Sequence, residues 1–238
     1  MMRYIKQFIS TLAIVVALTP LTLQSAEKSA QHPYQVGFSD AKTSDPMGGN
    51  MRYGIWYPTD EGEGIIRRGP FAFPGTQNAQ PAAGKFPLVM ISHGTEGTYL
   101  GHRNIAIELA RRGLVTVAVL HPRDNFRDAS GAGHRIVWEG RPRQISALID
   151  TMLKDARWGE LIAQDKIGAF GFSLGGYTVL SLLGAEHNLP VLMEHCQKNG
   201  ANDPMCDLRG GLATAMQSIY KVEYEGCLLY TSPSPRDS

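Results

Sequence analysis

The sequence lacks an excess of charge of either sign. Among its 238 residues, 23 lysines and arginines nearly balance 22 aspartates and glutamates, which gives a formal net charge of +1. A protein that binds nucleic acid usually carries a basic surface, so we expect no nucleic-acid partner. The length and the 43% hydrophobic content are sufficient for one sizeable core.

The chain also lacks a hydrophobic run long enough to span a bilayer. The apolar stretch near the N-terminus, Phe8 to Leu18, is shorter than the ~20 residues of a transmembrane helix. Arg3 and Lys6 precede it, and Pro20 and small residues follow it. Because this is the layout of a secretory signal peptide, we expect residues 1–26 to be cleaved. The alternative, a transmembrane anchor, is disfavoured by the length. The expected location is periplasmic or secreted, without a stable membrane anchor.

Cysteine is scarce, with three in the chain. Cys196 and Cys206 flank a polar, loop-like segment, and an exported protein meets oxidising conditions. We therefore favour a disulfide between them, with two free buried thiols as the alternative. His187 and His195 lack the paired spacing of a zinc motif, so we expect neither a metal nor a cofactor.

The last residues, 227–238, resemble no natural structural element. Cys227 to Asp237 is the translation, in one frame, of DNA that resembles the end of a transposase-based sequencing adapter. A disordered Ser/Pro tail is the alternative that composition suggests. We expect the genuine protein to be interrupted near Gly226 and exclude the tail from the fold.

The residues that are present include one informative motif, Gly171-Phe172-Ser173-Leu174-Gly175. It follows an apolar strand-like run, 167–170, and precedes a helix-like run, 177–183. A serine between a strand and a helix, with glycines on both sides, is typical of a nucleophile held at a strained turn. Ser173 is therefore the candidate nucleophile. The alternative is a serine that only caps the helix.

Attack of a serine on an ester generates an oxyanion, which needs backbone N–H donors. In a strand–turn–helix of this kind, one donor follows the nucleophile, and another comes from the loop after the third strand. The candidates are the amides of Leu174 and of Thr95, with Gly94 letting the backbone turn toward the site. His93 beside them is expected to be structural.

The spacing of apolar residues predicts strands at 35–38, 52–57, 87–92, 114–120 and 167–172, and helices at 103–112, 144–154 and 177–183. Residues 61–84 and 124–143 are expected to be loops. Beyond Leu183 we expect only loops and a short helical stretch, 212–222. Alternation of strands and helices predicts an α/β protein with a mostly parallel, doubly wound sheet.

Four segments together resemble the dienelactone hydrolase-like branch of the α/β-hydrolases, which includes relatives similar to platelet-activating-factor acetylhydrolase. They are 91–94, 101–103, 117–124 and 168–176, within a region of resemblance from about Gln35 to Leu183. The resemblance implies an α/β-hydrolase domain over 27–226, without its last strands. It also implies a metal-independent serine esterase acting on a small ester or lactone. Dienelactone hydrolases proper have a cysteine nucleophile where this chain has Ser173.

The acid and histidine that such a serine needs follow it in the α/β-hydrolase chain order. The candidates before Gly226 are His187, His195, Asp203, Asp207 and several glutamates, and we expect these to be structural or surface residues. The chain as printed is then an inactive fragment of an enzyme. The alternative is a non-catalytic binding protein on the same fold.

We predict that the genomic locus continues past codon 226 with residues other than 227–238. Sequencing of the locus measures this directly, and a native stop codon immediately after codon 238 would contradict it.

Overall fold

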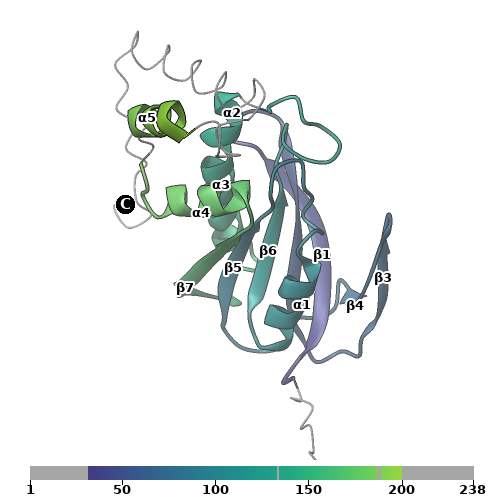
Figure 1. Ribbon diagram of the computed structural model, residues 1–238. Coiled ribbons are helices and arrows are strands. Elements are labelled where there is room, and N and C mark those ends of the chain that lie inside the picture. Colours follow the sequence, from purple (N-terminus) through teal and green to yellow (C-terminus); the bar gives the residue numbers. More distant parts are fainter. Residues whose placement is uncertain (1–31, 133, 187–188, 200–238) are drawn as a thin grey trace, which may run out of the picture. The chain divides into compact units, whose positions relative to one another are not determined.

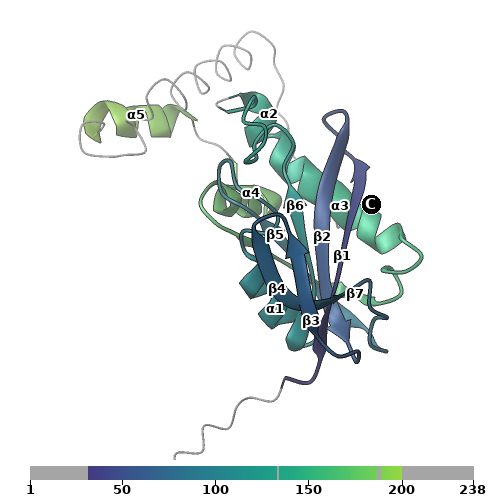
Figure 2. The same cartoon turned by 90° about the vertical axis from the view of Figure 1, so that its right-hand side faces the viewer.

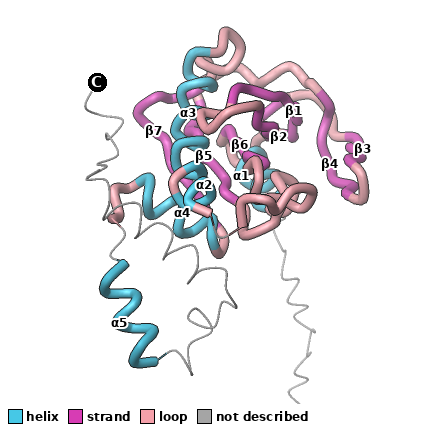
Figure 3. Tube along the Cα trace, turned by 90° about the horizontal axis from the view of Figure 1, so that it is seen from above, coloured by secondary structure: helices cyan, strands magenta, loops and turns pink. Residues whose placement is uncertain are grey.

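A seven-stranded mixed sheet is the framework of the protein. The computed structural model describes residues 32–199 apart from 133, 187 and 188. The chain divides into two units after Gln31, and every described residue belongs to the second. Across the sheet the strands run β3-β4-β1-β2-β6-β5-β7 (Figures 1 and 3). Their bounds are β1 Gln35–Ser44, β2 Asn50–Thr59, β3 Gly64–Arg68, β4 Phe71–Gln77, β5 Phe86–Ser92, β6 Val115–Leu120 and β7 Ile162–Gly171.

Helices cover both faces of the sheet. Helix α1 packs its alanine and isoleucine side chains on one face, and α3 packs Ile145, Leu148 and Met152 on the other (Figure 2). The helix bounds are α1 Arg103–Arg111, α2 Arg135–Trp138, α3 Gly140–Lys154, α4 Leu174–Leu182 and α5 Leu189–Asn199. The predicted α/β class is confirmed. Among the described residues, no helix is long and apolar enough to cross a membrane.

The central strands β5 and β6 form as their sequences predict. Both are runs of apolar, largely β-branched residues, and such runs suit strands that are covered on two faces. Leu88, Val115 and Val117 are completely buried. The two strands pair in parallel, so Ser92 at the end of β5 and His121 after β6 reach the same edge of the sheet.

The sheet is less parallel than expected. The pairs β5–β6, β5–β7 and β1–β4 are parallel, but β1–β2, β2–β6 and β3–β4 are antiparallel. The expected loop 61–84 contains the β3–β4 hairpin. Its connection is the two residues Gly69-Pro70, with Gly69 at a φ of 57°. A glycine in this conformation at the first central position matches the twist of a hairpin.

Several boundaries differ from the prediction. Helix α3 begins at Gly140 instead of 144, and β7 begins at Ile162 instead of 167. The short helix α2 occupies part of the expected loop 124–143. Helix α5 lies where only a loop was expected, and it carries Cys196. Cys196 is disulfide-bonded. Cys206 and the stretch 212–222 lie outside the described residues, so the pairing of Cys196 with Cys206 stays a prediction.

Strand β7 is largely exposed, although its second half, 167–170, is apolar. In the described part of the chain it pairs only with β5, and residues 164–169 are all exposed. The side chain of Ile167 is 38% exposed, and Leu180 and Leu183 on the neighbouring helix are 58% and 80% exposed. Parallel strands are normally covered on both sides, so this edge of the sheet is unlike the rest.

Candidate active site

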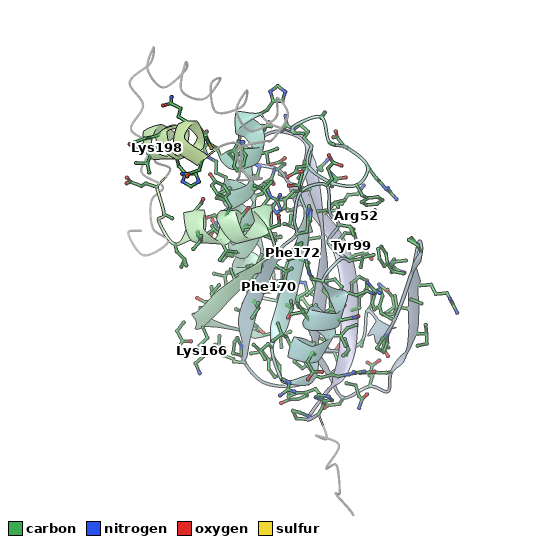
Figure 4. All side chains as sticks on the ribbon, viewed as in Figure 1. Arg52, Tyr99, Lys166, Phe170, Phe172 and Lys198 are labelled. Atoms are coloured by element: carbon green, nitrogen blue, oxygen red, sulfur yellow. The ribbon has the colours of Figure 1, made fainter. Side chains whose placement is uncertain are left out.

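Ser173 lies in the two-residue connection between β7 and α4, next to Phe172, where the strand meets the helix (Figure 4). Its backbone has φ 53° and ψ −120°. A residue with a Cβ atom rarely adopts a positive φ, and such a conformation costs about 1–3 kcal/mol. Strain of this kind at a strand-to-helix serine is the feature that exposes the hydroxyl of a nucleophile.

The two flanking glycines are required by close backbone contacts. A methyl group at Gly171 would overlap the Gly175 carbonyl group and lie 2.6 Å from the Gly176 nitrogen. A methyl group at Gly175 would overlap the Ser92 carbonyl oxygen and lie 2.9 Å from that of His93. The start of α4 therefore rests directly on the end of β5, which places Ser173 above the carboxyl edge of the sheet.

The hydroxyl of Ser173 does not cap the helix. Ser173 occupies the N-cap position of α4, but its side chain makes no capping hydrogen bond. The residue is exposed. Within the described residues the hydroxyl is therefore open to solvent and to a substrate. The alternative of a serine that only caps the helix is not what this geometry shows.

The loop after β5 lies against the same serine. A methyl group at Gly94 would stand 3.4 Å from Ser173 Cβ, and the Phe172 amide donates to the Ser92 carbonyl oxygen at 3.2 Å. Thr95 is exposed in this loop. Over residues 32–199, outside the gaps, neither the Thr95 amide nor the Leu174 amide donates a hydrogen bond to the protein. The structure thus brings the two proposed donors and Ser173 into one region.

His93 is a structural residue. Its side chain is 2% exposed, its Nδ1–H donates to the Gly94 carbonyl oxygen at 2.7 Å, and its Nε2 accepts from the His121 amide at 3.2 Å. Burial, together with the positive charge of Arg141, lowers the pKa of His93 to about 4. Both ring nitrogens of His93 are engaged in hydrogen bonds, and the lowered pKa makes the ring a weak base. His93 therefore cannot take the proton of Ser173.

A buried polar cluster beneath the loop was not found from the sequence. Asp124, assigned there to a loop, is 1% exposed and pairs with Arg141 on α3 at 2.7 Å. His121 and Gln144 join them, and each is at most 1% exposed. One sequence feature could have indicated this cluster: polar residues stand at the ends of two buried strands, namely Ser92, His93 and His121. In open α/β sheets that edge is where ligands bind.

The base and acid for Ser173 are not among the described contacts. No histidine or carboxylate hydrogen bonds to Ser173 in the described ranges. The His102 ring packs against the Phe172 ring at a tilt of 52°, with centroids 5.4 Å apart, and His195 lies exposed on α5. His187, Asp203 and Asp207 lie outside the described residues. The described part of the chain also holds no group of three His, Cys, Asp or Glu side chains arranged for a metal.

No family model and no curated protein matches the chain. A solved structure does: ferulic acid esterase from Streptomyces cinnamoneus, with a TM-score of 0.54 and 18% sequence identity. The described part of the chain has a fold similar to that of this esterase structure. The match covers 63% of this chain and 56% of the esterase chain, so the chain spans little more than half the length of that structure. At this identity the likeness concerns the fold alone.

We predict that His93 makes the protein less stable as the pH falls from 6.5 to 4. Its pKa is about 4 when folded and near 6.5 when unfolded, so in this window only the unfolded chain takes up the proton. The contribution lost is about 3 kcal/mol at pH 4. Urea unfolding at several pH values measures it. His93→Gln should flatten the dependence relative to the exposed control His134→Gln, and parallel curves for the two variants would contradict the prediction.

We predict that Gly175→Ala lowers the free energy of unfolding by about 3 kcal/mol, because overlap with a rigid backbone must be relieved. The matched control is Gly168→Ala in β7, where the added methyl group meets no atom within 4 Å. The control should change stability by less than ~1 kcal/mol. Thermal unfolding of the two variants is the measurement, and equal stability would show that α4 does not rest on β5 as described.

Proposed function

We propose that the protein is a serine hydrolase that cleaves a carboxylic ester or a lactone through an acyl-enzyme on Ser173. The observation that carries the proposal is the strained connection between β7 and α4, which exposes an unbonded serine hydroxyl beside two amides that have no acceptor among the described residues. A hydrolase-like fold is consistent with this chemistry, although a fold alone does not determine function.

In the proposed reaction, Ser173 Oγ attacks the substrate carbonyl carbon while a histidine takes the hydroxyl proton. The oxyanion that forms accepts hydrogen bonds from the amides of Leu174 and Thr95. The intermediate collapses, the alcohol leaves with the proton from the histidine, and Ser173 remains acylated. Water then attacks the acyl group by the same route, which releases the acid and restores the serine.

The histidine and its acidic partner belong, in this proposal, to sequence beyond Gly226. Among the described residues, one edge of β7 has no partner strand, and this supports a longer natural chain, because a following strand would pair with that edge and cover Ile167. The adapter-like residues 227–238 support it independently. The chain as printed is accordingly proposed to be inactive. We also propose that the enzyme is exported, on the signal-like residues 1–26.

We predict that Ser173→Ala lowers kcat at least about 10³-fold in the protein with the C-terminus read from the locus, because no other group replaces the nucleophile. Hydrolysis of p-nitrophenyl esters measures the rate. The matched control is Ser181→Ala on the same helix, whose hydroxyl donates to the Tyr177 carbonyl oxygen at 3.0 Å. This control should retain full activity.

Undiminished turnover in Ser173→Ala would rule out the assigned nucleophile. The protein with its natural C-terminus and an intact Ser173 should bind a fluorophosphonate covalently at that serine, and the 238-residue chain should not. A natural C-terminus without a histidine and a carboxylate would instead favour a binding protein on this fold.

A further inference from the structure

Arg141 and Asp124 form an ion pair that is almost completely buried. Arg141 and Asp124 each have side chains 1% exposed, and Arg141 Nη1 donates to Asp124 Oδ2 at 2.7 Å. Burying two charges costs several kcal/mol of solvation, so such a pair seldom adds net stability. A pair of this kind therefore needs an explanation beyond stability, and its other contacts provide one.

Both members of the pair hold the backbone of the loop next to Ser173. Asp124 Oδ1 accepts the Glu96 amide at 3.0 Å. Arg141 Nη2 donates to the His93 carbonyl oxygen and to Ser92 Oγ, the latter at 3.3 Å. The two contacts lie on either side of Gly94 and Thr95. One ion pair thus fixes the two ends of the segment that carries the proposed Thr95 donor.

The segment between these contacts is a tight turn. The Gly97 amide donates to the Gly94 carbonyl oxygen at 3.1 Å, and Glu96 has a φ of 53°. A turn of this form usually has glycine or asparagine at its third position, so glutamate there needs support. Asp124 supplies it, because its bond to the Glu96 amide sets the direction of the Thr95–Glu96 peptide. That direction in turn limits where the preceding amide, that of Thr95, can point.

A chain of hydrogen bonds with a defined donor-to-acceptor direction also holds the Arg141 side chain in place. A guanidinium only donates, so Ser92 Oγ accepts from Arg141 and donates to His121 Nε2 at 2.9 Å. His121 Nδ1 then donates to Gln144 Oε1 at 2.7 Å, and Gln144 donates to the Asp45 carboxylate at 3.2 Å. Every member is buried. The chain ties the arginine to both α3 and the β1–β2 connection.

The geometry points to Arg141 and Asp124 as positioning residues for the oxyanion donor at Thr95. They act through the Gly94–Gly97 turn and do not touch the substrate. This inference rests on the proposed function, since the oxyanion exists only if Ser173 attacks a carbonyl group. It goes beyond that function in assigning a catalytic purpose to a buried ion pair on α3 and on the loop after β6.

The test uses Arg141→Lys in the protein with its natural C-terminus. Lysine keeps the positive charge beside Asp124, but its single ammonium group cannot reproduce the fork that bridges Asp124, Ser92 and the His93 carbonyl group. We predict a loss in kcat of about 10-fold with KM changed less than ~3-fold, because a displaced donor acts on the transition state more than on the bound ester. Steady-state hydrolysis of p-nitrophenyl esters measures both constants.

The matched control is Arg143→Lys on the same helix, a half-buried residue that pairs with Glu139 at 3.9 Å; it should leave kcat unchanged. Titration of Ser173 with a fluorophosphonate gives the concentration of active sites. A merely structural role would lower that concentration, whereas a positioning role lowers the rate per titrated site. A kcat per site for Arg141→Lys equal to that of Arg143→Lys would overturn the inference, even where Ser173→Ala upholds the proposed function.

A second variant, Asp124→Asn, tests the other half of the pair without activity. In the 238-residue chain, the Glu96 amide should exchange its hydrogen at least about 10-fold faster in Asp124→Asn than in the parent chain, while amides of the core strand β5 keep their protection. Unchanged exchange at Glu96 would show that Asp124 does not hold the turn. Loss of protection throughout the chain would show that the pair serves global stability, and this would also overturn the inference.

Discussion

The candidate site depends on one steric constraint, the contact between the start of α4 and the end of β5. Gly175 lies so close to the carbonyl groups of Ser92 and His93 that no side chain fits between them. Because of this contact, the chain must turn within two residues after β7, and Ser173 takes the strained conformation of that turn. The same contact brings the loop at Gly94 against the serine. The exposed hydroxyl and the two neighbouring amides are thus consequences of one close approach.

The strain at Ser173 and Glu96 is stabilised from inside the protein. Beneath the loop, charged and polar side chains replace the apolar packing found elsewhere in the core, and they hydrogen bond to one another in a fixed direction from Arg141 to Asp45. Burial keeps both His93 and His121 in their neutral forms by lowering the pKa of each ring. Hydrogen bonds in such a dry environment are strong and hard to rearrange, so the cluster makes the edge of the sheet rigid.

The opposite situation holds at β7. The second half of this strand, 167–170, is apolar, yet six of its ten residues are exposed in the described part of the chain. The helix that follows it is also apolar on sides that meet no other described element, as Leu180 shows. Among the described residues, the two edge strands of the sheet are β3 and β7, and β7 lies beside the candidate nucleophile.

Local patterns in the sequence determined the elements near the site. The apolar runs of β5 and β6 and the glycines around Ser173 depend on neighbours within a few residues, so their spacing is sufficient to predict them. The β3–β4 hairpin was missed because its proline and glycine content resembles a loop, and only pairing across the sheet distinguishes the two. Arg141 and Asp124 were missed for a related reason. Seventeen positions separate them, and a charged residue in the sequence resembles a surface residue until folding encloses it. The sequence by itself thus determined the strand–turn–helix motif of the candidate nucleophile and the α/β class, because these are encoded in short-range spacing. Only the tertiary structure decided which polar side chains are buried and which strand edge is open, because both depend on segments that meet through folding.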